Sequence, residues 1–275
     1  MIVPPGGQDP VWEVMGIVNV TPDSFSDGGL WLHPKAAVDH GRALAEQGAA
    51  LVDVGGESTR PGAEPVDEAL ERERTVPVVA GLAAAGIRVS IDTTKLVVAE
   101  AALAAGARYV NDVSAFRADP ELAGLVADRR VACCLMHMRG EPRTMQDAPR
   151  YADVVDDVKA FLLDRVEFAV GEGVREERIQ LDPGIGFGKT GEHNLTLLHR
   201  LPELVALGFP VVVGTSRKSF LGRLTGRADA QQRLPGTLAA NVLALAGGAR
   251  VFRVHDVAEH VDALTVAAAT LRGHA

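Results

Sequence analysis

Short apolar runs recur along the whole chain and alternate with longer stretches rich in alanine and leucine. Apolar runs without a polar face are typical of parallel strands that are buried on both sides, and the longer stretches are typical of helices packed on them. The runs predict strands at 14–20, 51–55, 87–92, 108–111, 131–136, 178–182, 210–214 and 250–254. The longer stretches predict helices at 35–48, 67–85, 95–105, 120–129, 152–173, 192–207, 217–224, 235–247 and 256–272.

The number of strand–helix units selects the fold class. About eight such units is the count of a TIM barrel, whereas a doubly wound sheet usually has fewer strands. No linker rich in Ser, Gly and Pro and no block of like charges divides the sequence. We therefore predict an α/β fold, a (β/α)8 TIM barrel, as a single domain over 1–275 with 1–13 as an N-terminal extension.

Composition and charge limit the partners. The 275 residues are 47% hydrophobic and 23% charged, which suits a large buried core. Lys and Arg total 28 against 36 Asp and Glu, a formal net charge of −8. A chain with this balance repels nucleic acid and anionic membranes, so neither is expected as a partner. An anionic substrate would have to be held by local positive groups.

The first residues and the cysteines bear on location. The opening MIVPPGGQDP has no basic start and no apolar core before a cleavage site, and no run approaches the ~18 apolar residues of a membrane span. Cys133 and Cys134 are adjacent within an apolar run, which is poor geometry for a disulfide and lacks metal-ligand spacing. We expect buried reduced thiols in a soluble cytoplasmic protein.

Polar residues follow nearly every predicted strand. In a TIM barrel the active site lies where strands end and loops begin, so these positions are the place to look for chemistry. The residues there are Asn19, Asp53, Glu57, Asp92, Asn111, Asp112, His137, Arg139, Asp182, Ser216, Arg217, Lys218, Arg253, His255 and Asp256. Loop solvation alone does not account for this pattern, which therefore predicts an enzyme.

Two kinds of group alternate among these strand ends. Carboxylates and amides, at Asp92, Asn111 and Asp182, form paired hydrogen bonds with the edge of a flat heterocycle. By contrast Asp53 and Asp112, hard against strand interiors, are the positions we expect to be merely structural. The first group predicts a planar ligand.

Cations form the second group. Arg60, Lys218 and Arg253, with His255, can bind a multiply charged oxyanion, and Ser216 begins a loop that enters a helix N-terminus. A ligand that carries phosphate is predicted. The nearby GIGFGKT has three residues between its flanking glycines where a P-loop has four, so it predicts no nucleotide cofactor. No histidine cluster has the spacing of a zinc site.

Eight separated motifs span essentially the whole chain: NVTPDSFSDGG, DVGGESTRPGA, SIDTTK, VNDVS, LMHMRGEPRTMQ, LDPGIGFGKT, TSRKSFLG and FRVHD. In these motifs the chain resembles the dihydropteroate synthases, folate-pathway enzymes that sulfonamides inhibit. Related pterin-binding methyltransferases share the barrel and part of the pterin pocket. They are not expected to carry TPDSFSDGG, STRPG and SRKSF together, which favours the synthases.

The resemblance implies a reaction and assigns residues to it. The reaction condenses 6-hydroxymethyl-7,8-dihydropterin pyrophosphate with p-aminobenzoate to give 7,8-dihydropteroate and pyrophosphate. The pterin ring would be bound by Asp92, Asn111, Asp182 and Lys218. Pyrophosphate would be bound by Asn19, Arg60, Arg253 and His255, with Mg²⁺ at Asn19. The p-aminobenzoate site would comprise Phe25, Thr59, Arg60, Pro61, Phe187 and Ser219. The catalytic set would be Asn19, Asp92, Lys218, Arg253 and His255, in a homodimer.

Further expectations follow from the same resemblance. The aromatic amine is neutral near pH 7, so we expect no strong general base and no covalent enzyme nucleophile. The loops after the first two strands should be disordered or open without substrates. The family carries a glycine pair after VNDVS, where this chain has Ala115 and Phe116. Phe116 either packs at the barrel rim, which we favour, or narrows the mouth of the pocket.

Two competing functions stay open from the sequence. A folate-dependent methyl-transfer protein with the same barrel would bind methylated tetrahydrofolate and would not turn over p-aminobenzoate. A non-catalytic pterin-binding paralogue would bind pterin pyrophosphate and release no pyrophosphate when the amine is added.

Overall fold

The computed structural model describes residues 12–21, 34–59, 62–141 and 143–273. Three predicted site residues, Phe25, Arg60 and Pro61, lie outside these ranges. The loop after the first strand, 22–33, also lies outside them, so the expected open loops are not tested. Within the described ranges, no helix is long and apolar enough to cross a membrane.

All eight predicted strands are confirmed, and only their ends differ. They are β1 (Glu13–Asn19), β2 (Leu51–Gly55), β3 (Val89–Asp92), β4 (Tyr109–Asp112), β5 (Ala132–Met136), β6 (Ile179–Asp182), β7 (Val212–Val213) and β8 (Val251–Val254). Glu13, which we placed in the N-terminal extension, is the first residue of β1 and is bonded through its backbone to Arg250.

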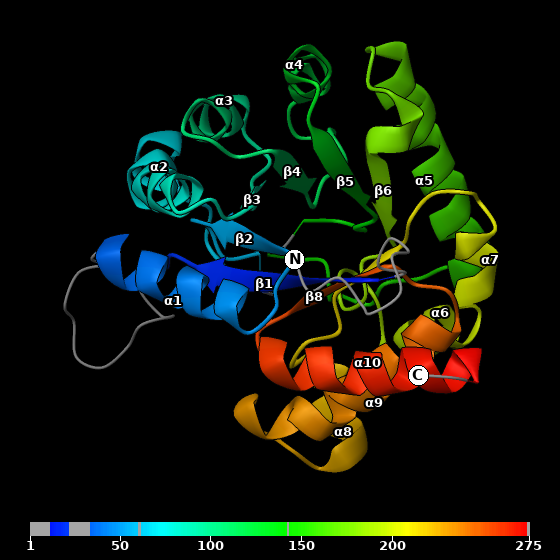
Figure 1. Ribbon diagram of the computed structural model, residues 1–275. Helices are drawn as coiled ribbons and strands as arrows, with labels where there is room; N and C mark the ends of the chain where they lie inside the picture. Colours follow the sequence, from blue (N-terminus) through cyan, green and yellow to red (C-terminus); the bar gives the residue numbers. More distant parts are fainter. Residues whose placement is uncertain (1–11, 22–33, 60–61, 142, 274–275) are drawn as a thin grey trace.

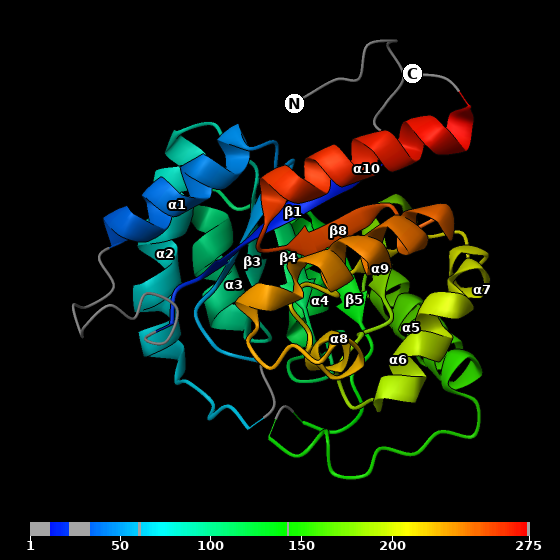
Figure 2. The same ribbon diagram turned by 90° about the horizontal axis from the view of Figure 1, so that it is seen from below.

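The strands form one parallel sheet that closes on itself. Its order is β6-β5-β4-β3-β2-β1-β8-β7, and an isolated parallel bridge from Leu181 to Val211 joins its two edges. The helices lie around the outside of the strands (Figure 1), and Figure 2 shows α10 lying along β1 and β8. The predicted (β/α)8 TIM barrel is therefore confirmed.

The helices follow the predicted pattern with one correction. They are α1 (Pro34–Glu46), α2 (Glu68–Ala84), α3 (Leu96–Ala104), α4 (Glu121–Arg129), α5 (Val154–Gly171), α6 (Gly191–His199), α7 (Leu201–Val205), α8 (Ser219–Thr225), α9 (Leu234–Ala246) and α10 (Val257–Arg272), with short 3-10 turns at Glu176–Arg178 and Gln231–Arg233. The single helix predicted over 192–207 was wrong, because it divides into α6 and α7. Pro202 has no N–H to continue the hydrogen bonds of α6, and it stands in the first turn of α7, where that N–H is not needed.

Two apolar layers hold the barrel together. Strand residues that point outward, such as Val52, Ile91 and Phe252, pack under the helices in the main core. Inward residues at the amino-terminal end, among them Met15, Tyr109 and Val251, fill the barrel interior in a separate cluster. This apolar layer fills the amino-terminal end of the barrel, and a site in such a barrel is expected at the carboxyl ends of the strands.

Candidate active site

Strand register places several predicted residues at the same height of the barrel. In the parallel ladder Asn19 is paired with Gly55, Gly55 with Asp92, and Asp92 with Asn111. Asp182 ends β6 beside Met136 of β5. Because the strands are parallel, these side chains all belong to the carboxyl end of the barrel, as the sequence predicted.

A hydrogen-bonded network links four strands beneath this end. Arg253 of β8 donates from Nε to Asp53 Oδ2 and from Nη2 to Asp92 Oδ2, both at 2.6 Å. Asn111 Nδ2 donates to the same Asp53 oxygen at 3.0 Å. Asp53 is completely buried. Its role is structural, because its carboxylate orients two predicted site residues, Arg253 and Asn111.

Burial shifts the pKa values of the carboxyl groups. Burial raises the pKa of Asp92 from 3.8 to about 7; Arg253 opposes the shift, whereas Asp53 and Glu71 add to it. Burial also raises the pKa of Asp182, opposed by the Gly184 amide and by Lys218, Lys189 and Arg253. Both carboxyl groups respond to Arg253, so the two face the same cationic centre.

The loop after β6 folds back over the barrel end. Asp182 Oδ1 accepts from the Gly184 amide at 2.6 Å. Gly184 has φ +66°, and a Cβ there would lie 1.9 Å from the carbonyl oxygen of His137. Only glycine fits a backbone this close in the left-handed region. Gly184 therefore serves close packing of this loop against the loop after β5.

Lys189, which the sequence reasoning missed, holds this loop from inside. Its Nζ lies 2.8 Å from His137 Nδ1 and donates to the carbonyl oxygens of Phe187 at 3.0 Å and His137 at 3.3 Å. Burial lowers the pKa of Lys189 well below its usual range and brings that of His137 to about 2. The sequence does carry a signal for this role: Lys189 stands in an apolar, glycine-rich loop, whereas most lysines lie in polar, exposed segments.

Lys218 reaches the same region from the loop before α8. Its Nζ lies 4.0 Å from the centre of the Phe187 ring, a cation–π arrangement. A Cβ on Gly186 would lie 3.0 Å from Lys218 Cδ, so the glycine leaves room for the lysine. The loops after β6 and β7 thus bring Phe187 and Lys218 together, while Ser219 is the first residue of α8.

A second polar group lies between the ends of β7 and β8. Ser216 Oγ lies 2.9 Å from His255 Nδ1 and accepts from the His255 amide at 3.2 Å. Next to it Arg217, at φ +57°, forms two hydrogen bonds with Asp256. Ser216 and His255 are therefore held together where β7 and β8 end, and their binding of an anion stays a prediction.

Asp112 is structural, as predicted. Its carboxylate accepts from the amides of Ser114 at 2.7 Å and Phe116 at 2.6 Å. This turn holds Ala115 at φ +54° and Phe116 at φ +61°, the region that glycine adopts most easily. Phe116 is fully buried in the main core. Phe116 therefore packs, as we favoured, but within the core and not at the barrel rim.

The structure brings most of the predicted residues together. Asp92, Asn111 and Arg253 share one network, Asp182 and Lys218 interact electrostatically, and Thr59 lines a small cavity that includes Asp92. Arg253 is hydrogen-bonded to two carboxylates, Asp53 and Asp92, and Asp92 is itself one of the predicted pterin residues. Its predicted contact with pyrophosphate would have to come from the remaining part of its guanidinium group.

The oxygen-bearing side chains at the barrel mouth determine how Mg²⁺ could bind. Within the described ranges no group of three or more His, Cys, Asp and Glu side chains is placed to hold a metal ion. Asn19 offers a single amide oxygen at the end of β1. Mg²⁺ commonly takes one or two protein oxygens together with substrate phosphates, so Asn19 fits an ion that arrives with pyrophosphate.

Comparison with known proteins identifies the relatives of this chain. The family described as pterin binding enzyme matches residues 15–255. The dihydropteroate synthase of Mycobacterium leprae is 54% identical over 265 residues, which cover 94% of this chain and 93% of the relative.

Solved structures agree with the sequence comparison. A Xanthomonas albilineans dihydropteroate synthase with 4-aminobenzoic acid is 51% identical with a TM-score of 0.89, covering 94% of this chain and 93% of that one. The same enzyme in complex with 7,8-dihydropteroate is 48% identical with a TM-score of 0.86, covering 94% of each chain.

Proposed function

This chain belongs to the dihydropteroate synthases of the pterin-binding enzyme family, and from that premise we propose that its barrel mouth joins a dihydropterin to p-aminobenzoate. The protein is a transferase of folate biosynthesis. The observation that carries the proposed site is the network in which Arg253, Asp53, Asp92 and Asn111 meet just beneath the carboxyl ends of four strands.

The pterin ring is assigned to the carboxylates and amide at the base of the mouth. Asp182 and Asp92 would accept the ring's N–H donors, and Asn111 can both donate and accept. Lys218 would donate to the carbonyl side of the ring. The network beneath fixes Asn111 and Asp92 before the ligand arrives, which favours binding because little ordering is left to be done.

Pyrophosphate is assigned to the polar groups at the rim. Asn19 would hold Mg²⁺, and His255, Arg253 and Arg60 would bind the phosphate oxygens. Mg²⁺ when bound would neutralise the charge that develops on the departing pyrophosphate. His255 is oriented for such a contact by its bond with Ser216.

The reaction needs one bond broken and one bond formed. The bond between the pterin methylene carbon and its pyrophosphate oxygen breaks with its electron pair left on pyrophosphate, and the conjugated pterin nitrogens spread the positive charge. The amine nitrogen of p-aminobenzoate attacks that carbon and then gives up one proton to water. Burial raises the pKa of Cys133 to about 12, so this thiol is no nucleophile near neutral pH.

The p-aminobenzoate pocket is assigned to side chains around the pterin groups. Phe187 comes from the loop after β6, Ser219 is the first residue of α8, and Thr59 comes from the loop after β2. Phe25, Arg60 and Pro61 complete the proposed pocket. An aromatic ring beside Lys218 suits a substrate that has both a ring and a carboxylate.

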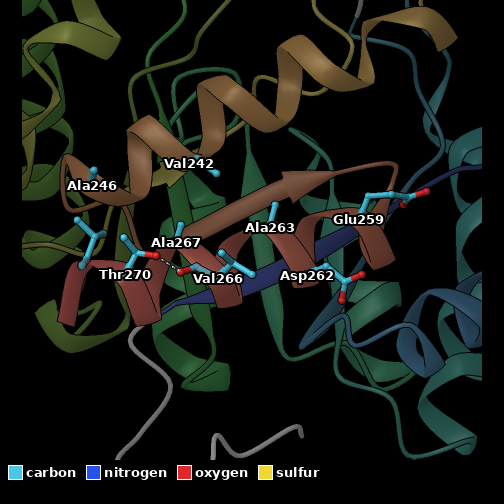
Figure 3. A pocket seen from close by; sticks show the side chains of 9 residues that line it. Val242, Ala246, Glu259, Asp262, Ala263, Val266, Ala267 and Thr270 are labelled. Carbon is cyan, nitrogen blue, oxygen red and sulfur yellow. Dashed lines mark hydrogen bonds between the residues drawn. The ribbon is translucent and has the colours of Figure 1, made fainter. Parts of the chain in front are cut away.

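We also propose a cytoplasmic homodimer. An apolar groove of about 710 Å³ lies between α9 and α10 (Figure 3) and is lined by Val242, Ala263 and Val266 among others. Val266 and Leu271, which both line the groove, are 67% and 59% exposed, and a contiguous exposed apolar patch is typical of a protein–protein contact. A second copy is the proposed cover, and the free thiols of Cys133 and Cys134 suit a reducing compartment.

Sedimentation velocity tests the dimer. Val266→Glu would place a charge in the proposed interface and should give a monomer where the unmodified protein sediments as a dimer. Leu163→Glu on α5, at a residue 45% exposed and outside the groove, is the matched control and should leave the mass unchanged. A dimer that survives Val266→Glu would place the interface elsewhere.

Pyrophosphate release tests the function. Release should require the pterin pyrophosphate, p-aminobenzoate and Mg²⁺ together, and sulfonamides should compete with p-aminobenzoate. Turnover of methylated tetrahydrofolate in place of p-aminobenzoate would favour the methyl-transfer alternative. Pterin binding without release would favour a non-catalytic paralogue.

A further inference from the structure

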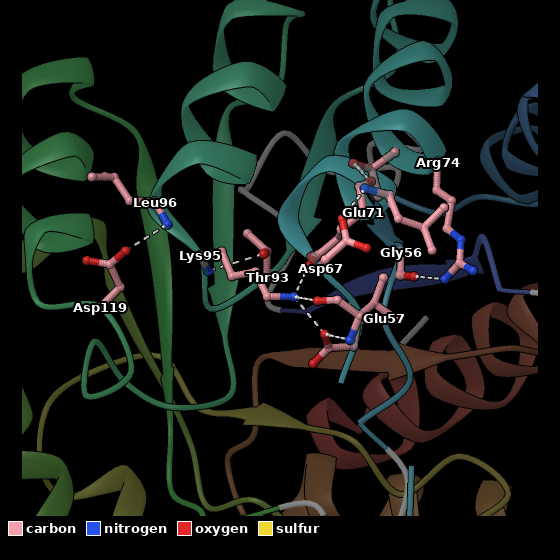
Figure 4. Close-up of polar contacts among 12 residues, drawn as sticks. Gly56, Glu57, Asp67, Glu71, Arg74, Thr93, Lys95, Leu96 and Asp119 are labelled. Atoms are coloured by element: carbon pink, nitrogen blue, oxygen red, sulfur yellow. Dashed lines mark hydrogen bonds and ion pairs between the residues drawn. The ribbon is translucent and has the colours of Figure 1, made fainter. Parts of the chain in front are cut away.

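A cluster of three charged side chains lies beside the predicted site. It joins the loop after β2, helix α2 and the residue before α3. Lys95, just before α3, places its Nζ 2.6 Å from Glu57 Oε2 and 2.5 Å from Glu71 Oε2 (Figure 4). The same ammonium donates to the backbone carbonyl of Val66 at 2.6 Å. All three protons of the ammonium therefore have acceptors, which is a complete set for lysine.

The cluster ties together the two ends of one loop. Glu57 follows β2, and its Oε2 accepts the Val66 amide at 2.8 Å as well as the Lys95 ammonium. Val66 lies nine positions further along the chain, just before α2. Lys95 and Glu57 together therefore hold both the amide and the carbonyl of Val66 against the end of β2.

The base of this arrangement is tightly packed on α2. A Cβ on Gly56 would lie 2.7 Å from Thr75 Cγ2 and 3.0 Å from Glu71 Cγ, so the backbone rests directly on the helix. Arg74 Nη1 also donates to the Gly56 carbonyl at 2.9 Å. Glu71 is only 1% exposed, and an unpaired carboxylate there would be costly. Lys95 supplies the partner that this buried side chain needs.

Electrostatics agree with that requirement. Burial alone would lower the pKa of Lys95, but hydrogen bonds and attraction to Glu57 and Glu71 raise it overall. The cluster also adjoins the reacting groups, because Glu57, Thr59 and Glu71 line the same small cavity as Asp92. Replacing Lys95 would therefore first alter the position of the loop that carries Thr59.

We propose that Lys95 is a positioning residue for p-aminobenzoate, because it fastens Val66 to Glu57 and so fixes where Thr59 lies. This inference rests on the proposed function, which assigns Thr59 to the amine pocket. Lys95 acts through the loop and does not contact the substrate. A loop that is already ordered binds with a smaller loss of conformational freedom than one that must be ordered by its ligand.

Steady-state kinetics of Lys95→Met test the inference. The KM for p-aminobenzoate at saturating pterin pyrophosphate should rise about tenfold, because the pocket must be ordered on binding. The KM for pterin pyrophosphate should change less than about twofold, since Asp92 shares a cavity with the cluster but Asn111, Asp182 and Lys218 also hold the ring. Lys159→Met, which removes a lysine paired with Asp156 and Glu203 on the surface, is the control and should alter neither KM.

Two further measurements make the result decisive. Hydrogen exchange at the Val66 amide should quicken in Lys95→Met and not in Lys159→Met. If Lys95→Met fails to fold, Glu71→Gln/Lys95→Met removes both buried charges and should give the same selective rise. Unchanged kinetics, or an equal rise in both KM values, would overturn the inference while the unmodified protein remained active. An unmodified protein that releases no pyrophosphate with p-aminobenzoate would overturn the proposed function first, and the inference with it.

Discussion

Replacing Asp53 with asparagine tests whether the buried network positions the pterin groups. The substitution keeps the shape of the side chain and removes the charge that accepts from Arg253 Nε at 2.6 Å and from Asn111 Nδ2 at 3.0 Å. One carboxylate oxygen serves both donors, and the amide that replaces it could turn either its oxygen or its NH2 group towards them. Asn111 would then lose its fixed orientation.

The structure sets the size of the effect. A hydrogen bond to a charged group contributes about 1.5–3 kcal/mol net, whereas leaving a buried charge without any partner costs about 3–5 kcal/mol. Arg253 keeps Asp92 as a partner at 2.6 Å, so the variant should lie in the lower range. We expect Asp53→Asn to lose about 2 kcal/mol of unfolding free energy and about tenfold in affinity for pterin pyrophosphate.

Urea denaturation followed by circular dichroism gives the stability, and isothermal titration calorimetry gives the affinity. Asp164→Asn is the control, because Asp164 is 74% exposed and 3.7 Å from Arg165. It should stay within about 0.5 kcal/mol of the unmodified protein. An Asp53→Asn variant with unchanged stability and unchanged pterin affinity would refute the positioning role of this network.

Two further predictions concern a proton and a glycine. Since burial raises the pKa of Asp92 from 3.8 to about 7, the folded protein holds a proton that the unfolded chain has lost. The resulting stabilisation is complete below about pH 3.8 and is lost as the pH rises through about 7. Asp92→Asn should therefore flatten the fall in unfolding free energy across that window, and an unchanged slope in urea titrations would contradict it. Gly184→Ala should destabilise far more than Gly86→Ala, because a Cβ at Gly184 meets the His137 carbonyl at 1.9 Å, whereas Gly86 has a similar φ and nothing within 4 Å. Strain alone costs about 1–2 kcal/mol, so equal melting temperatures of the two variants would argue against the close packing of this loop.

The fold was readable from the sequence because its signal is local. Apolar runs mark each strand, and their count indicates the barrel. The prediction of one helix over 192–207 was wrong, because the helical periodicity continues past Pro202. The missing N–H of Pro202 is what divides the segment into two helices.

The site was readable only in part. Parallel strands guarantee that residues such as Asp92 and Asn111 share one end of the barrel, so their convergence was predictable. The partners of each side chain were not predictable, because they depend on register and rotamers. Asp53 was expected to be structural, yet nothing local showed that it joins Arg253 to Asn111. Lys95 ends the SIDTTK motif, but its partners come from two other elements.

The most direct test of the central claim is a crystal structure with pterin pyrophosphate bound. The account predicts the pterin ring at the carboxyl end of the barrel, with Asp182, Asn111 and Lys218 in hydrogen-bond contact with it and its diphosphate directed towards His255. A pterin bound elsewhere, for example in the groove between α9 and α10, with those side chains left untouched, would contradict it.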